Sequence, residues 1–223
     1  GGFVLSWHSS VGQWEFGGNE LKIKEVFVSI FQASIASVQD LDAFIDAASW
    51  SRDLIKDMGC TDTSIMQVAV GGDQVGLIGI SFDWGTMDAA LEGSAALMAN
   101  DQIRQMMGDC GVTLHRRSLM RILGERGERK GTYLSCVYTS GTPSADGMDV
   151  GWGLMKDGCN GLMGAAGVIT GMSPWTGAIF SWTDSIDSLM ECSAKAWADP
   201  QMAEIQAKSD TKPVGRIIGR ILA

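Results

Sequence analysis

The hydrophobic positions of this chain change their spacing several times, from short apolar runs to helical intervals and back. Runs rich in β-branched and aromatic residues predict strands, and apolar residues three or four positions apart predict helices. In the first half the predicted strands are 25–32, 63–70, 75–82 and 112–123, and the predicted helices are 40–59 and a segment that begins at Met87. The order is strand, helix, strand, strand, helix, strand.

The second half repeats this order after a charged, glycine-containing stretch, "GERGERKG". Its predicted strands are 132–139, 165–172, 176–182 and 214–222, and its predicted helices are 147–164 and 185–208. The two halves are therefore expected to share one arrangement of elements.

A residue-by-residue match at an offset of 99 supports an internal duplication. The stretch "MANDQIRQMM" (98–107) matches "WADPQMAEIQ" (197–206), and the arginines and leucines near the end of each half also match. Such a repeat indicates two copies of one structural unit. The pattern predicts an α+β fold with an N-terminal extension (1–22), a βαββαβ repeat (23–124), a linker (125–130) and a second repeat (131–223).

The βαββαβ order, together with a polar "ADPQM" break in the second helix, resembles the dimeric α+β barrel superfamily. In that superfamily two ferredoxin-like sheets face each other and close a barrel. The resemblance implies that the two repeats form such a barrel within one chain, as in tandem members such as the chlorite dismutase group. It implies a fold and no particular reaction. Trp7, Trp14 and Phe16 of the extension suggest a strand or clasp that lies on the barrel.

Composition narrows the class of protein. A net charge of -9 argues against nucleic-acid binding, and no apolar run approaches the roughly 18 residues of a membrane span. The five cysteines show no CxxC spacing, which is typical of free thiols in a reducing, cytoplasmic setting. With only two histidines, His8 and His115, a His/Cys metal site is not expected. A homo-oligomer is compatible with these features.

Arginines near the end of each repeat are the first candidates for chemistry. Residues two apart share a face of a strand, so His115, Arg117 and Arg121 fall on one face, and Arg216 and Arg220 on its counterpart. The opposite face, which carries Met120 and Ile217 among others, is expected to pack under the helices. The arginines either bond carboxylates such as Asp83 or Glu125, lie near the rim in water, or form a site for an anion or carboxylate. His115 is either structural or a proton-transfer group.

Aromatic and glycine residues suggest a pocket. Trp84, Tyr133, Trp152 and Trp182 either wall a site for a flat, apolar ligand or belong to the core. The stretch 147–167 contains seven glycines, which favours either a pocket wall or tight packing.

Two functions of different classes follow. The first is a cofactor-independent enzyme of the monooxygenase, cyclase or isomerase type, which acts on a hydrophobic small molecule between a sheet and its helices. His115, Arg117 and Arg216 would be its catalytic residues. The alternative is a non-catalytic ligand-binding or interaction module. Use of haem, which the chlorite-dismutase resemblance suggests, would require a histidine in the second repeat, and that repeat has none.

Overall fold

The computed structural model describes residues 14–16, 19–21, 29–141 and 144–223. Strands β1 (Trp14–Phe16) and β2 (Asn19–Leu21) pair as a two-stranded antiparallel sheet. The predicted contact between the N-terminal extension and the barrel lies outside the described residues. None of the described helices is long and apolar enough to cross a membrane.

The first repeat has the predicted order of elements. It consists of β3 (Ile30–Ser37), α1 (Leu41–Asp57), β4 (Cys60–Val70), a 3-10 turn (Gly72–Gln74), β5 (Ile78–Trp84), α2 (Met87–Ala99), α3 (Asp101–Asp109) and β6 (Thr113–Gly127). Residues 25–28 of the predicted first strand lie outside the described residues, and the strand continues to Ser37 rather than ending at residue 32. Its added residues include small side chains that have little intrinsic preference for strands. Because β3 is buried between two neighbouring strands, packing overrides that preference.

The second repeat follows with β7 (Tyr133–Ser140), α4 (Asp146–Met155), β8 (Gly161–Ile169), β9 (Gly177–Thr183), α5 (Ile186–Ala198), α6 (Pro200–Ser209) and β10 (Lys212–Ile221). The predicted helix 147–164 was too long, since α4 ends at Met155 and β8 already begins at Gly161. A side chain at Gly161 would meet the backbone oxygen of Glu128 at 2.2 Å. The close approach of two backbones therefore explains this glycine, which helical spacing alone had placed in a helix.

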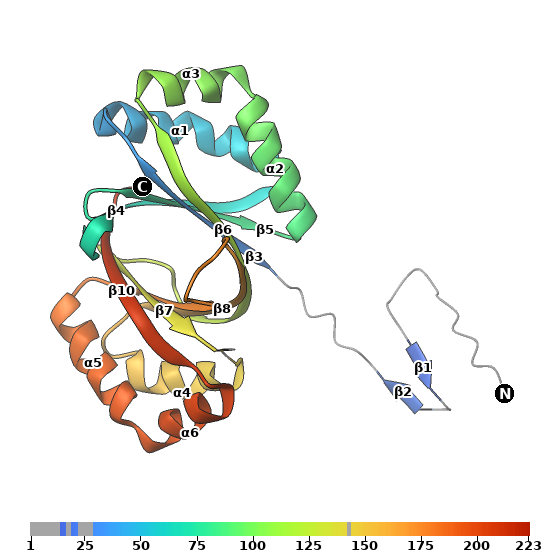
Figure 1. Ribbon diagram of the computed structural model, residues 1–223, viewed down its shortest axis with the longest axis vertical. Helices are drawn as coiled ribbons and strands as arrows, with labels where there is room; N and C mark the ends of the chain where they lie inside the picture. Colours follow the sequence, from blue (N-terminus) through green and yellow to red (C-terminus); the bar gives the residue numbers. More distant parts are fainter. Residues whose placement is uncertain (1–13, 17–18, 22–28, 142–143) are drawn as a thin grey trace.

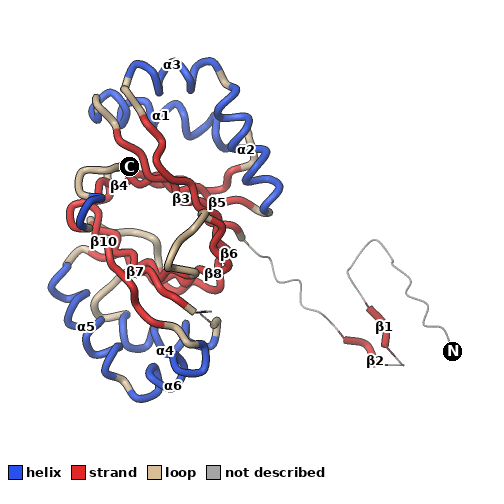
Figure 2. Tube along the Cα trace, viewed as in Figure 1, coloured by secondary structure: helices blue, strands red, loops and turns tan. Residues whose placement is uncertain are grey.

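The eight long strands form one closed antiparallel barrel in the order β10-β4-β5-β3-β6-β8-β9-β7. Within each repeat the last strand pairs with the first, and the junctions between repeats are β6 with β8 and β10 with β4. Figures 1 and 2 show the helices of the two repeats on opposite outer sides of this ring. The chain thus has the dimeric α+β barrel fold within a single polypeptide.

Successive residues of a strand face opposite layers of this structure. In β3, Ile30 belongs to the cluster under the helices of the first repeat, and Phe31 belongs to the cluster inside the barrel. Inside the barrel Phe31 packs against Phe180 of β9, with ring centroids 4.8 Å apart. Both faces of each sheet are therefore buried.

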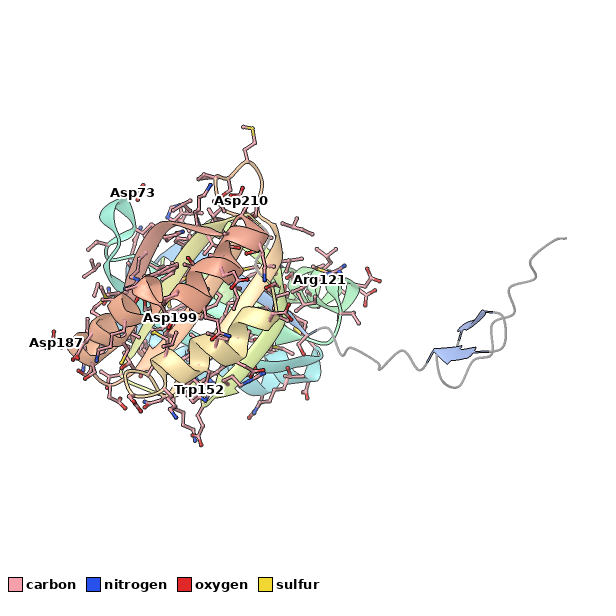
Figure 3. The ribbon with its side chains drawn as sticks, turned by 90° about the horizontal axis from the view of Figure 1, so that it is seen from below. Asp73, Arg121, Trp152, Asp187, Asp199 and Asp210 are labelled. Carbon is pink, nitrogen blue, oxygen red and sulfur yellow. The ribbon has the colours of Figure 1, made fainter. Side chains whose placement is uncertain are left out.

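The duplicated stretch marks an equivalent helix break in each repeat. Asn100 ends α2 and caps α3, and its side chain accepts a hydrogen bond from the Ile103 amide at 3.0 Å. Asp199 does the same between α5 and α6, and accepts from the Gln201 and Met202 amides. Figure 3 shows Asp199 at this break. A polar cap at the start of the next helix explains why the break is retained in both copies.

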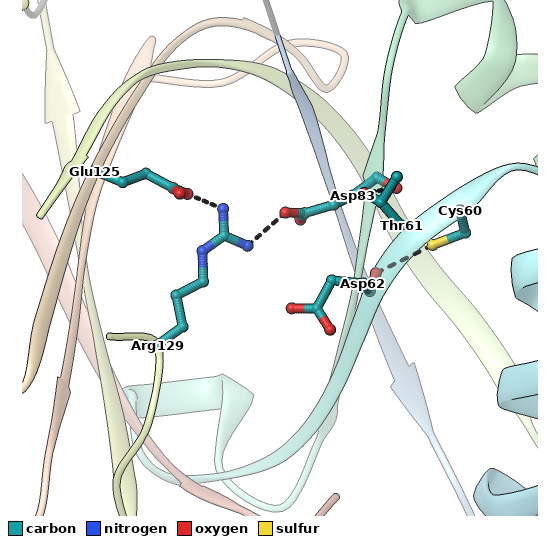
Figure 4. A network of polar contacts seen from close by, with 6 residues as sticks. All are labelled: Cys60, Thr61, Asp62, Asp83, Glu125 and Arg129. Carbon is teal, nitrogen blue, oxygen red and sulfur yellow. Dashed lines mark hydrogen bonds and ion pairs between the residues drawn. The ribbon is translucent and has the colours of Figure 1, made fainter. Parts of the chain in front are cut away.

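Arg129, in the connection between the repeats, closes one end of the barrel. Its guanidinium bonds Asp83 of β5 at 2.6 Å and also pairs with Glu125 (Figure 4). It lies over the rings of Phe31 and Trp182, at 5.8 and 5.7 Å from their centroids. Burial raises the pKa of Asp83, and Arg129 acts against that rise. Arg129 therefore joins the two repeats, through a partly buried ion pair with Asp83 of the first and through the Trp182 ring of the second.

We expect Arg129→Gln to lower the free energy of unfolding by about 2 kcal/mol, because it leaves Asp83 ionised, only 13% exposed and without its cation. The matched control is Arg126→Gln, whose partner Asp149 is 78% exposed, and it should cost less than about 1 kcal/mol. Urea unfolding at neutral pH measures both values. Equal effects of the two substitutions would contradict this role of Arg129.

The same variant gives a pH test. Because the pKa of Asp83 is raised in the folded state, its ionisation opposes folding, and its contribution to stability falls as pH rises through the folded pKa. Loss of Arg129 raises this pKa further. The destabilisation of Arg129→Gln should therefore be largest at neutral pH and should shrink as pH falls toward about 4, near the ordinary pKa of a carboxyl group. A penalty independent of pH would show that Asp83 is not its source.

Candidate functional site

Each repeat contains an apolar pocket between its half of the barrel sheet and its own helices. The first-repeat pocket has a volume of about 110 Å³ and the second-repeat pocket about 100 Å³. Each lies between the sheet, the first helix of the repeat and the broken second helix. Their equivalent placement follows from the duplication.

The first-repeat pocket is lined mostly by aliphatic, methionine and phenylalanine side chains from all three helices and from the sheet. Its apolar lining includes Phe44, Ala48, Ile55, Ile80, Phe82, Leu97, Ile103, Met106 and Met107. Its charged lining residues are Arg52 of α1 and Arg117 of β6. No Asp, Glu, His, Cys or Lys is among the described residues that line it.

The second-repeat pocket has one arginine, Arg216 of β10, in the place of Arg117. The apolar lining includes Val137, Met148, Met155, Leu162, Ile179, Ala196, Trp197, Met202 and Ile205. Met148 fills part of the space beside β8, since a side chain at Gly164 would meet the Met148 sulfur at 2.7 Å. The second pocket is thus narrowed by one of its own methionines.

The arginine face of the last strands was assigned to the wrong side. Arg117 and Arg216 lie under the helices, whereas Met120 and Ile217 lie inside the barrel. The alternation held from Arg117 to Arg121 but not at Leu114, which lines the same pocket as Arg117. An apolar row does not identify the helix side when the other side of the sheet is buried too. Burial lowers the pKa of both guanidinium groups.

The last strand of each repeat contains a β-bulge, and His115 is the bulged residue of β6. Arg116 pairs with Ile35 and Leu114 pairs with Ala36, so His115 is an extra residue in β6. Its counterpart Val214 is the extra residue in β10. His115 is exposed, and its Nε2 atom lies 3.0 Å from the Ser37 hydroxyl. It adjoins Leu114, which lines the first-repeat pocket, but it does not line the pocket itself.

The four predicted wall residues do not come together. Trp84 is 1% exposed in the core under the first-repeat helices, and Trp182 is 4% exposed inside the barrel. Trp152 packs on the outside of the second repeat against the cluster around Met155 (Figure 3). Tyr133 is half-buried at the start of β7. None of them lines either sheet–helix pocket as the described residues define it.

The carboxylates suggested as arginine partners are used elsewhere. Asp83 and Glu125 both pair with Arg129 rather than with Arg117 or Arg121. Toward the other end of the barrel, Arg116 donates to the Tyr138 hydroxyl at 3.1 Å and lies 5.3 Å from the Trp175 ring. Burial raises the pKa of Tyr138 to about 12, so it stays protonated. These interior arginines thus have partners within the barrel.

Several polar residues in or beside the pockets had only indirect signals in the sequence. Arg52 lies on a predicted helix next to Asp53, a pattern typical of an exposed charged residue. Gln32 is a polar residue inside a predicted apolar strand. The recurrence of Ser94 as Ser193 was visible at the 99-residue offset, and both serines prove to be buried polar groups of the sheet–helix layer. The internal repeat was the one sequence signal that could have identified these two serines.

Solved structures with the same architecture share very little sequence with this chain. A haem-binding protein from Thermus thermophilus is 11% identical over 87% of this chain and 91% of its own, with a TM-score of 0.55. A protein provisionally named as a chlorite dismutase is 10% identical over 87% and 95%, with a TM-score of 0.52. A Fusobacterium nucleatum protein provisionally named as a monooxygenase is 9% identical over 89% and 94%, with a TM-score of 0.50.

These likenesses establish the fold. No protein-family model matches the chain, and no curated protein resembles it in sequence. The fold is one that serves both enzymes and ligand-binding proteins, so the activity has to be argued from the pockets of this chain.

The residues of the two pockets do not fit haem. Haem iron takes an axial histidine, cysteine thiolate or tyrosine, or a methionine together with a histidine. Neither described pocket lining contains histidine, cysteine or tyrosine. His8 lies outside the described residues, and the second repeat has no histidine in its sequence. Volumes of about 110 and 100 Å³ also fall below the roughly 300 Å³ at which pockets for drug-sized ligands begin.

Proposed function

We propose that the protein binds a small apolar molecule in the first-repeat pocket, between the sheet and helices α1, α2 and α3. The observation that supports this proposal is a cavity of about 110 Å³ whose lining is mostly apolar and includes the guanidinium groups of Arg52 and Arg117. Natural ligand sites combine an apolar lining with a few polar groups in this way. A cavity of roughly 150 Å³ lined by aliphatic and aromatic side chains binds benzene. The first-repeat pocket therefore suits an apolar group the size of a benzene ring or smaller.

The chemistry of the lining favours binding over catalysis. General acid–base catalysis requires a titratable group within hydrogen-bonding reach of the substrate. Among the described residues, arginine is the only ionisable type that lines the pocket. An arginine orients and stabilises an anion, but it does not exchange protons near neutral pH. The geometry therefore favours a ligand-binding protein.

Filling the pocket tests this function. Ala48 is buried and lines the pocket, so we expect Ala48→Met to abolish binding of benzyl alcohol while the melting temperature stays the same or rises. The matched control is Ala43→Met on the exposed side of α1, which should bind like the unmodified protein. Ligand-observed NMR measures binding. Equal binding by all three proteins would place the probe elsewhere and refute the proposal.

A cofactor-independent enzyme is the second candidate, because His115 lies on the bulge beside the pocket residue Leu114. If a bound apolar compound is turned over, His115→Ala should lower kcat by about 100-fold or more, as expected for loss of a general base. The histidine is exposed, so the free energy of unfolding should change by less than about 0.5 kcal/mol. Unchanged turnover would remove His115 from the mechanism.

The cysteines bear on the cellular setting. All five are free and buried, which supports the predicted reducing, cytoplasmic compartment. Whether the chain forms a homo-oligomer is a separate prediction, which the molar mass in solution would test.

A further inference from the structure

We propose that the ligand of the first-repeat pocket carries a carboxylate, which Arg117 binds together with Arg52, while its apolar body occupies the cavity. This inference rests on the proposed binding function and specifies the chemical class of the ligand. In the second-repeat pocket the corresponding arginine already donates to side chains of the protein, so we expect weaker carboxylate binding there. The contrast between the two repeats carries the argument.

The first-repeat pocket holds uncompensated positive charge. Arg52 and Arg117 line it, and neither side chain makes a hydrogen bond or ion pair with any residue in the described ranges. The Arg117 Nε atom is buried without a partner there. A guanidinium nitrogen taken out of water without an acceptor is costly, and buried charges are normally paired. An anionic ligand would supply the missing acceptor.

The second repeat shows what the same arginine does when it is structural. Arg216, the counterpart of Arg117 at the 99-residue offset, donates from Nη2 to the Ser193 hydroxyl at 2.7 Å. Its Nη1 atom contacts the Met190 sulfur, also at 2.7 Å. Both arms of this guanidinium thus have a partner on α5.

The equivalent serine in the first repeat bonds a glutamine instead of the arginine. Ser94 is the counterpart of Ser193, and its hydroxyl donates to the Gln32 side-chain oxygen at 2.9 Å. Gln32 is 1% exposed and comes from β3, so the bond is fixed within the core. Because Ser94 is occupied by Gln32, it is not bonded to Arg117. Arg117 therefore lacks the serine contact that Arg216 makes in the second repeat.

A carboxylate fits this arrangement better than other anions. A guanidinium group offers parallel N–H donors that match the two oxygens of a carboxylate. The surrounding lining is aliphatic and aromatic, and a doubly charged phosphate would be much costlier to desolvate there than a single negative charge. The methionines Met98, Met106 and Met107 can adapt to different apolar bodies. The expected ligand is a monocarboxylate with an apolar body no larger than about a phenyl ring.

Calorimetric titration of the full chain with benzoate and with benzyl alcohol, its uncharged counterpart, tests the proposal. At neutral pH we expect the unmodified protein to bind benzoate more tightly. Arg117→Gln should weaken benzoate binding by at least about 10-fold, which corresponds to the loss of a hydrogen bond to a charged group. Binding of benzyl alcohol should stay within about 2-fold. The matched control Arg216→Gln should leave benzoate binding unchanged.

Each result separates the carboxylate inference from the binding function. If benzyl alcohol and benzoate bind the unmodified protein equally well, or if Arg117→Gln binds benzoate normally, the carboxylate inference is overturned and the binding function stands. If neither probe binds, the binding function fails and the inference fails with it. Circular dichroism checks the fold of each variant. If Arg117→Gln does not fold, Arg117→Lys keeps the charge without the paired donors, and unweakened benzoate binding by that folded variant would also overturn the inference.

Discussion

Each four-stranded sheet of this protein has two apolar faces, and the helices of its own repeat cover only one of them. The other face is buried only when the second sheet closes the barrel, as the packing of Phe31 on Phe180 illustrates. A single repeat would leave this whole face in water, at a cost of roughly 25 cal/mol for every Å² of apolar surface. The duplication, the pairing of β6 with β8 and of β10 with β4, and the inward position of Arg129 all follow from this requirement.

The same requirement leaves the sheet–helix layer free to diverge. Changes inside the barrel affect both repeats at once, whereas the layer under the helices belongs to one repeat alone. The second repeat has filled part of that layer with Met148 and bonded its arginine to Ser193. The first repeat has placed Ala48 on the pocket wall and paired Gln32 with Ser94. The two pockets thus have similar volumes of about 110 and 100 Å³, and they differ in whether their arginine donates to side chains of the protein.

Much of the fold could be predicted from the sequence, because the signals were local. Helical spacing and the matching helix breaks "ANDQI" and "ADPQM" predicted the order of elements and the duplication. The errors arose where the environment on both sides of a strand matters. An apolar row containing Met120 could not reveal whether it faced the helices or the barrel, and the glycines after α4 suited a helix until the neighbouring backbone was in place.

The candidate site was predictable only in part for the same reason. Arg117 and Arg216 drew attention because the repeat preserved them, but their difference lies in contacts that spacing does not encode. Arg117 and Arg216 occupy equivalent positions on their strands, and burial lowers the pKa of both. What separates them is a glutamine on β3 that takes the serine hydroxyl in one repeat. A buried guanidinium nitrogen without an acceptor costs stability, so the unpartnered Nε atom of Arg117 beside an apolar cavity supports the inference of an anionic ligand that supplies the acceptor.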